Sequence, residues 1–309
     1  MSESIGKVQL ESLYRSGEDR RIDRDEAEDR ILELVSCYQE REYPRILTEN
    51  PSWPILLHLS PLRESLMNWI PFRVGQRILE IGSGCGAVTG AFLHKGLEVT
   101  CVEPSLQKSR INATRHEDCG ELRILVGEAW EILPRLEERF DHVTLIGWPE
   151  QATAGCGAEE ALRTALRSIL PVLKDDGVLW TATGNRLGMK YFAGCKEDYT
   201  GEYFEGICGY PHGGEAQTWS RKELIRLAGE GGYSCNFYYP YPDWQFPVKI
   251  FSDEYLPRRG ELNRNWQTFS ADRLKLFDES RAYDSVIEAG MFPEMSNAFL
   301  IEMRKKVAE

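Results

Sequence analysis

The chain has 309 residues, 42% of them hydrophobic and 28% charged, which suits one large domain with additions or two small domains. Its formal net charge of −12 repels a phosphate backbone and argues against nucleic acid as a partner. No run of roughly 18 apolar residues occurs, so we expect no membrane span. The acidic, polar start predicts no secretory signal, and eight cysteines without a CxxC pair predict free thiols in the cytoplasm.

The first elements in chain order are expected to form an N-terminal helical extension over residues 1–55. Residues 1–20 are expected to be frayed. From Ile22 to about Glu42, apolar residues at helical spacing follow a charged run, which predicts a surface helix. A second helix is expected from His58 to Ile70, because apolar residues again recur at helical spacing and Pro61 falls in the first turn.

Strands and helices then alternate, which is typical of a parallel sheet covered by helices. The expected strands are Arg77–Ile81, Glu98–Glu103, Leu122–Val126, Asp141–Ile146, Gly177–Thr183, Tyr233–Tyr239 and Ala298–Met303. The expected helices are Ala87–Lys95, Leu106–Arg115, Ala129–Glu138, Ala158–Leu173 and one through Ala228 that a capping box at Ser220 and Glu223 opens. The fold class is therefore α/β, a Rossmann-like, seven-stranded, mostly parallel twisted sheet with helices on both faces.

Two long segments interrupt this alternation, residues 184–219 and residues 240–293, and both are rich in aromatic side chains. Substrate sites in α/β sheets are often built on such excursions after strand C-termini. We therefore expect one domain over residues 56–303, in which these two insertions form a substrate lid.

A glycine-rich turn, Gly82-Ser83-Gly84-Cys85-Gly86, stands between the first of these strands and a helix. Glycine permits positive φ and lets a ligand approach the backbone, and a helix N-terminus favours negative charge. The pattern Gly82-x-Gly84-x-x-Ala87 also satisfies the dinucleotide fingerprint. The turn alone therefore fits either NAD or S-adenosylmethionine (SAM).

Acidic residues around the turn favour SAM. Glu80 precedes the turn, Glu103 lies 21 residues after Gly82 at the end of the second strand, and Glu128 follows the third strand. The position of Glu103 suits ribose hydroxyls. This arrangement resembles motifs I to IV of class I SAM-dependent methyltransferases.

That resemblance implies roles for individual residues. Glu80 and the three glycines would surround the methionine part of SAM, Glu103 would take the ribose, and Glu128 with Ala129 the adenine amino group. Gly147 and Trp148 would face the sulfonium side. The expected cofactor set is completed by Arg63, Ser83, Pro104 and Ser105.

Longer motifs support a narrower resemblance, and they are His58–Glu64, Asn185–Gly194, Lys196–Gly201, Gly206–Tyr210, Tyr238–Asp243 and Tyr255–Pro257. Together they are similar to a bacterial methyltransferase family found beside, or fused to, glycosyltransferases of surface-polysaccharide and lipopolysaccharide synthesis. The resemblance covers about Leu57 to Met303. It implies a small-molecule or glycan acceptor and a glycosyltransferase partner, and it leaves the oligomeric state open. Tyr199 stands where family members usually carry histidine.

Methylation of a sugar hydroxyl calls for a general base, because a hydroxyl is a poor nucleophile. The candidates are His212, Asp198 and Glu150, with Tyr199 as a hydrogen-bonding partner; His212 is attractive because its unperturbed pKa is about 6.5. No local spacing supports a metal site, so none is expected.

Three alternatives stay open at this point. The chain could be an N- or C-methyltransferase, which needs no strong base. It could be a non-catalytic SAM-binding scaffold in a glycan assembly complex, with Tyr199 marking lost chemistry. It could also be an NAD-binding oxidoreductase.

Overall fold

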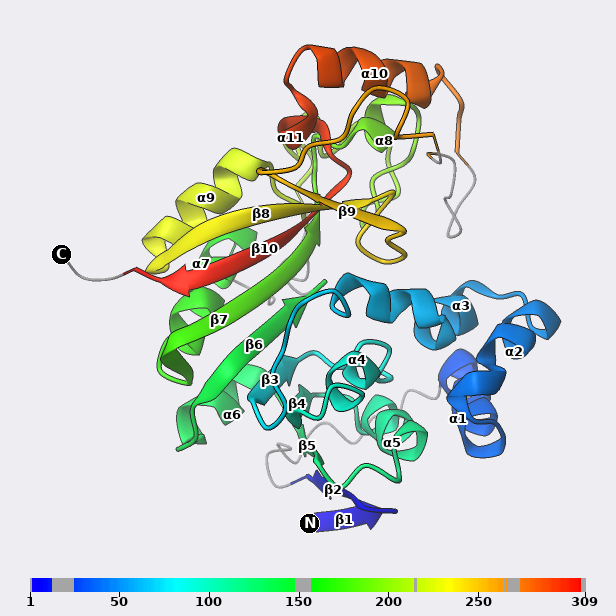
Figure 1. Ribbon diagram of the computed structural model, residues 1–309, viewed down its shortest axis with the longest axis vertical. Coiled ribbons are helices and arrows are strands. Elements are labelled where there is room, and N and C mark those ends of the chain that lie inside the picture. The colour runs from blue at the N-terminus through cyan, green and yellow to red at the C-terminus, as the bar shows by residue number, and fades with distance from the viewer. Residues whose placement is uncertain are drawn as a thin grey trace. The chain divides into compact units, whose positions relative to one another are not determined.

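The structure, a computed structural model, describes residues 2–12, 25–147, 157–213, 216–263, 265 and 273–306 (Figure 1). Its strands hydrogen-bond in the order β1-β2-β5-β4-β3-β6-β7-β10-β8-β9. This confirms the predicted Rossmann-like α/β fold, but the described residues form ten strands instead of seven. The chain divides into two compact units, unit 1 with Met1–Thr144 and Pro171–Gly177, and unit 2 with Leu145–Leu170 and Val178–Glu309.

The centre of unit 1 is a parallel arrangement of β3 (Arg77–Ile81), β4 (Glu98–Glu103) and β5 (Leu122–Val126). Most of their residues are buried, as expected for parallel strands with both faces covered. The register sets Glu103 opposite Val126, so the strand ends that carry the predicted ligand residues are neighbours.

Two short strands extend this sheet at its edge. β2 (Val8–Glu11) pairs parallel with β5, and β1 (Ser2–Ile5) pairs antiparallel with β2. The prediction that residues 1–20 are frayed is therefore wrong over residues 2–11. Val8 and Leu10 are fully buried while Gln9 between them is exposed, a period-two pattern too short to recognise in the sequence.

The N-terminal helices of unit 1 pack into one buried hydrophobic cluster, which also includes residues of the glycine turn and of a later helix. They are α1 (Glu26–Cys37), η1 (Glu40–Glu42), α2 (Tyr43–Glu49), α3 (Trp53–Leu59) and η2 (Pro61–Leu66). Buried side chains of α1, α2 and α3 pack with Cys85 of the glycine turn and with Ile111 of α5 (Leu106–Arg115). In Figure 1 these blue helices lie beside α4 and α5. The extension therefore packs directly against the turn predicted to bind SAM.

Four helices predicted in unit 1 differ from the structure. The one expected from Ile22 to about Glu42 ends at Cys37 as α1, and η1 begins separately at Glu40. The single helix from His58 to Ile70 is wrong, because Ser60 ends α3 and its hydroxyl caps η2 by accepting from Leu62 N–H. The helix after the glycine turn, α4 (Thr89–Leu93), and the helix after β5, α6 (Ala129–Ile132), are shorter than predicted. A 3-10 turn, η3 (Leu133–Arg135), follows α6 and carries Pro134, and β6 (Phe140–Ile146) comes next.

Unit 2 is built around an antiparallel set of strands. β10 (Ala298–Lys305) pairs antiparallel with both β7 (Leu173–Gly184) and β8 (Tyr233–Tyr241), and β8 pairs with β9 (Lys249–Ser252). The helices are α7 (Ala158–Ile169), α8 (Met189–Phe192), α9 (Arg221–Glu230), α10 (Glu279–Glu288) and α11 (Phe292–Met295). The predicted capping box of α9 is confirmed, since Ser220 and Glu223 bond reciprocally.

One buried asparagine ties the two predicted insertions together. The Asn297 side-chain oxygen accepts from Lys190 N–H at 2.9 Å and from the Tyr283 hydroxyl at 3.0 Å. Its amide nitrogen donates to the Pro242 carbonyl at 3.0 Å.

Among the described residues no helix is long and apolar enough to cross a membrane.

Candidate functional site

The glycine turn joins β3 to α4 in unit 1. Gly82, Gly84 and Gly86 all have positive φ, at +74°, +52° and +78°. A Cβ built on Gly82 or Gly84 would meet no atom within 4 Å, so the backbone there borders open space that a side chain would fill. The turn therefore offers a ligand close access to backbone groups.

Glu103 links the glycine turn to the start of α5. Its carboxylate accepts from Gly84 N–H at 2.9 Å and from Ser105 N–H at 3.0 Å, and the residue is 5% exposed. Burial raises the pKa of Glu103, against the opposing effect of these two N–H donors. The Ser105 hydroxyl caps α5 by accepting from Lys108 N–H. Pro104, which lies between Glu103 and Ser105, is exposed.

Glu80 lies beneath the same turn and is 4% exposed. Its carboxylate accepts from the Thr89 hydroxyl at 2.6 Å and from the Cys101 thiol at 3.5 Å, and the Asn112 amide donates to Thr89. Burial raises the pKa of Glu80 to about 7. Glu80 thus braces the first turn of α4 from inside the core.

The raised pKa of Glu80 predicts a pH-dependent stability. Because the folded-state pKa of about 7 lies above the ordinary 4.5, folding favours the protonated carboxyl, and this contribution is lost as pH rises through 7. We expect wild type to lose about 3 kcal/mol of unfolding free energy from this group between about pH 4.5 and pH 8. Glu80→Gln should flatten the slope. Urea denaturation at both ends of this range measures it, and identical slopes would contradict the assignment.

The other predicted ligand residues of unit 1 lie near this group. Gly127 N–H donates to the Glu103 carbonyl at 3.1 Å, which brings exposed Glu128 and buried Ala129 next to the end of β4. Ser83 is 6% exposed within the turn, and Arg63 on η2 is near enough to lower the pKa of Glu80 slightly. The structure therefore brings the unit 1 set together at the carboxyl ends of β3, β4 and β5.

Gly147 belongs to unit 2. Its N–H donates to the Ala182 carbonyl at 2.8 Å, and a Cβ built on it would lie 2.7 Å from the Trp244 ring. The Trp244 ring therefore packs closely on the Gly147 backbone. Trp148 and Glu150 lie outside the described residues.

His212 forms a carboxylate–imidazole pair with Glu205 in unit 2. Nδ1 lies 3.0 Å from Glu205 Oε2, and the His212 backbone N–H donates to Oε1 at 3.1 Å. Because the ionised carboxylate only accepts, the Nδ1 carries the proton and Nε2 is the acceptor nitrogen. The Glu205 side chain is 5% exposed and that of His212 is 83% exposed. Hydrogen bonding to Glu205 raises the pKa of His212 above its ordinary value.

Asp198 lies in a second cluster of unit 2, around a buried lysine. Lys190 Nζ donates to Asp198 Oδ2 and to Asp243 Oδ2, each at 2.9 Å, and the Tyr191 hydroxyl donates to Asp198 Oδ2 at 2.8 Å. Burial lowers the pKa of Lys190, but the two aspartates outweigh it and raise that pKa well above its usual range. Asp198 is therefore an ion-paired carboxylate.

Replacing Lys190 with methionine should destabilise unit 2. Lys190 is 8% exposed, and its loss leaves two carboxylates facing each other without a cation. Breaking a buried pair costs about 3–5 kcal/mol, and we expect about 2–3 kcal/mol because the Asp198 side chain is 42% exposed. Urea denaturation measures the change. Exposed Lys196→Met is the matched control, and an equal effect of both variants would contradict this role.

The chain between these two clusters has a strained backbone. The Glu197 carboxylate accepts from Tyr199 N–H, Thr200 N–H and the Tyr210 hydroxyl at 2.9, 2.7 and 3.2 Å. Tyr210 and Phe204 have φ of +56° and +64°, a conformation that side-chain-bearing residues rarely adopt and that recurs at functional sites. Tyr199 itself is 39% exposed. The hydrogen bonds of Glu197 hold this strained loop in place.

The sequence did not identify Glu205 or Lys190 as site residues. Glu205 lies seven residues before His212 in an irregular loop, so no periodicity connects them. A lysine reads as a surface residue, and burial of Lys190 follows only from its two aspartate partners. The nearest signal was the motif Asn185–Gly194, which contains Lys190.

Comparison with known proteins agrees with the fold. The family model of a methyltransferase domain matches residues 79–181. This segment has 103 of the 309 residues and runs from β3 into β7. None of the curated proteins matches the sequence.

Two solved structures are similar in fold. One is the CcbJ methyltransferase from Streptomyces caelestis, with TM-score 0.48, 15% identity, and coverage of 80% of this chain and 90% of that chain. The other is a SAM-dependent methyltransferase from Archaeoglobus fulgidus, with TM-score 0.48, 14% identity, and coverage of 79% and 93%.

Proposed function

We propose that this chain, a SAM-dependent methyltransferase by its methyltransferase domain, O-methylates a sugar or another small hydroxylated metabolite. The observation that carries the proposal is the His212–Glu205 pair. A hydroxyl must lose its proton as it attacks a methyl group, whereas a neutral amine needs no strong base. A histidine base that is paired with a carboxylate therefore favours a hydroxyl over an amine as the methyl acceptor.

The glycine turn fits the cofactor, because a side chain at Gly82 or Gly84 would occupy the open space beside the backbone. We assign the methionine part to this turn, the ribose hydroxyls to Glu103, and the adenine to Glu128 and Ala129. When bound, SAM supplies a methyl group activated by a positively charged sulfur. Gly147 is assigned to the sulfonium side, as is Trp148.

The base has a defined task in this proposal. Nε2 of His212 would accept the proton of the acceptor hydroxyl as the hydroxyl oxygen takes the methyl group from SAM. The carbon–sulfur bond of SAM would break with its electron pair staying on sulfur, so that S-adenosylhomocysteine leaves. Glu205 stabilises the imidazolium that forms, because its carboxylate accepts from Nδ1–H. His212 then releases the proton to water, to which its side chain is open.

Asp198 and Tyr199 receive binding roles. Two donors, Lys190 Nζ and the Tyr191 hydroxyl, already occupy Asp198 Oδ2, which leaves Oδ1 to accept from a hydroxyl of the acceptor. The exposed Tyr199 side chain is assigned to the same acceptor. Glu150 stays a candidate base outside the described residues.

The setting of the reaction is a further part of the proposal. We assign the acceptor to surface-polysaccharide synthesis with a glycosyltransferase as partner, on the motifs between His58 and Pro257. The insertions 184–219 and 240–293 are assigned to a substrate lid, since they carry His212 and Asp243 and are joined through Asn297. The seven described cysteines are free thiols, which suits the cytoplasm.

Radiolabelled methyl transfer tests the proposal. The full chain is incubated with methyl-labelled SAM and cell-envelope glycans, and the product is analysed by NMR for O-methyl against N-methyl carbons. We expect label in O-methyl sugars. Label in amines would show that the chain is an N-methyltransferase instead. SAM binding without any label in product would favour the non-catalytic SAM-binding scaffold. Calorimetry with NAD is the control, and tight binding of NAD but not SAM would overturn the cofactor assignment.

A further inference from the structure

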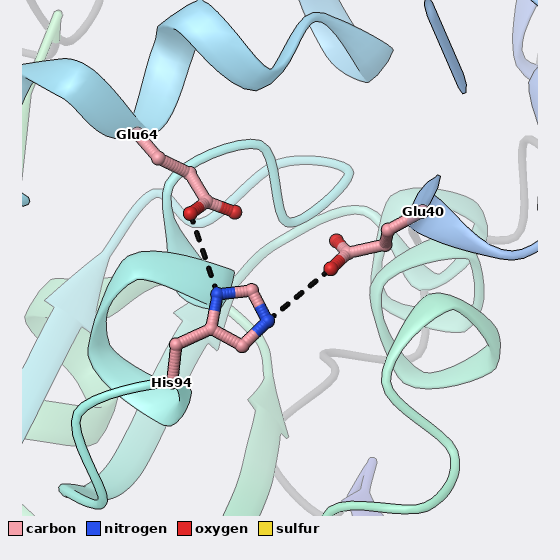
Figure 2. Close-up of side chains that lie close together, drawn as sticks. All are labelled: Glu40, Glu64 and His94. Carbon is pink, nitrogen blue, oxygen red and sulfur yellow. Dashed lines mark ion pairs between the residues drawn. The ribbon is translucent and has the colours of Figure 1, made fainter. Parts of the chain in front are cut away.

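Three ionisable side chains from three elements of unit 1 meet at one point. Figure 2 shows His94, at the end of α4, between Glu64 of η2 and Glu40 of η1. Nδ1 of His94 lies 3.4 Å from Glu64 Oε2, and Nε2 lies 3.3 Å from Glu40 Oε2. One ligand atom from each residue can be chosen so that all three lie within 4.8 Å of one another.

The separations suit metal ligands better than hydrogen bonds. A charge-assisted N–H···O bond is about 2.7–2.9 Å long, shorter than both contacts of His94. Nitrogen and oxygen ligands at about 2.0–2.2 Å from a tetrahedral metal lie about 3.3–3.6 Å apart. Each contact, at 3.3 or 3.4 Å, matches that spacing singly, but the two involve opposite nitrogens of one ring. A single ion therefore takes one ring nitrogen, and a turn of the exposed ring brings that nitrogen toward the second carboxylate.

Glu64 is a buried carboxylate whose ion-pair partner among the described residues is His94. It is 8% exposed, and its Oε2 accepts from the Asn68 amide only at 3.4 Å. Among the residues that the structure describes, no lysine or arginine forms an ion pair with it. Burial of an ionised carboxylate costs free energy unless a positive charge lies beside it. A cation bound by Glu64 together with its neighbours would offset this cost.

One oxygen of the Glu40 carboxylate is held by a buried arginine. Its Oε1 accepts from Arg115 Nε at 2.7 Å, and the Arg115 side chain is 2% exposed. Oε2 is left to face His94. Such outer-shell bonds orient ligands at metal sites. The two glutamates and Arg115 together carry a net charge of about −1, which attracts a cation.

We propose that Glu40, Glu64 and His94 bind a divalent metal ion of the zinc type. One imidazole nitrogen and one oxygen of each carboxylate provide three ligands, and water takes the fourth position. The His94 side chain is 57% exposed, so the ring can turn and the site is open to entering metal. The ion joins the N-terminal extension to the helix that follows the glycine turn. This site is independent of the proposed methyl acceptor.

Titration with Zn²⁺ alone tests the site. The full-length chain is freed of metal with a chelator, and binding is measured by calorimetry beside thermal unfolding. We expect one Zn²⁺ per chain and a higher unfolding temperature with Zn²⁺. Loss of a ligand in His94→Ala or Glu64→Gln should weaken affinity by more than the about 10–100-fold typical of outer-shell changes. Absence of binding to wild type would overturn the proposal.

Matched variants separate this site from others. His212→Ala removes a histidine that also faces a glutamate, and it should retain the metal. Co²⁺ spectra should lack thiolate charge-transfer bands, which excludes the exposed cysteines Cys37 and Cys208 as ligands. Binding that persists in His94→Ala, or that His212→Ala abolishes, contradicts the site. If His94→Ala does not fold, Glu40→Gln takes its place. Weaker Zn²⁺ binding by that variant supports the site, and unchanged binding contradicts it.

Discussion

A His212→Gln variant should transfer methyl groups about 100- to 10,000-fold more slowly than wild type, with unchanged affinity for SAM. Glutamine keeps a polar side chain but cannot take a proton from the acceptor. Its carbonyl or amide can still meet Glu205, so the fold should persist. Initial rates at saturating SAM measure the loss, and calorimetry measures cofactor affinity. A rate close to wild type would move the base to Asp198 or Glu150.

The pH profile distinguishes the base from a merely structural histidine. The Glu205 carboxylate raises the pKa of His212, so Glu205→Gln should lower it. Since the base acts only when deprotonated, the acid limb of kcat/KM should move to lower pH in Glu205→Gln. Glu202→Gln, an exposed neighbour with a smaller effect on His212, is the control. An unshifted limb would show that His212 does not set the profile.

A Gly86→Ala variant should bind SAM about 10- to 100-fold more weakly. Gly86 has φ of +78°, and a Cβ there would lie 2.3 Å from Asn112 Oδ1, the side chain whose amide donates to Thr89. The added atom must displace Asn112 or the turn. The left-handed backbone alone should cost about 1–3 kcal/mol of unfolding free energy. Calorimetry with SAM and urea denaturation measure the two effects.

Gly75 provides a control for backbone strain. It has the same φ of +78°, and a Cβ there would meet no atom within 4 Å. Gly75→Ala should therefore share the strain of Gly86→Ala but keep wild-type affinity for SAM. Equal cofactor affinity of the two variants would mean that the glycine turn is not the SAM site.

The parallel strands could be predicted because the sequence signal for each strand lies within its own few residues. Segments such as Arg77–Ile81 and Leu122–Val126 are apolar runs between polar turns, as buried strands require. β1, β2 and β9 were missed because each has four residues, too few for a recognisable period. The capping box at Ser220 was found because it involves side chains and backbone only three residues apart.

The candidate site was predictable only in part, because its contacts depend on the path of irregular chain. Gly82 and Glu103 were found through a motif in which strand, turn and acid have fixed spacing. The partner of His212 depends on the backbone around Phe204 and Tyr210, whose positive φ values no sequence rule anticipates for aromatic residues. The cluster of Glu40, Glu64 and His94 unites residues from three separate elements, and no spacing rule covers it.

Cys85 connects two events that are usually considered separately. This residue of the glycine turn is fully buried in the core formed by the N-terminal helices, and burial raises the pKa of its thiol to about 12, so it packs there as an apolar group. If SAM occupies the turn as proposed and binds better when α1, α2 and α3 are docked, the two events are coupled. By reciprocity, SAM would then favour docking of the helices by the same free energy. In that proposal the helical extension contributes to retention of the cofactor.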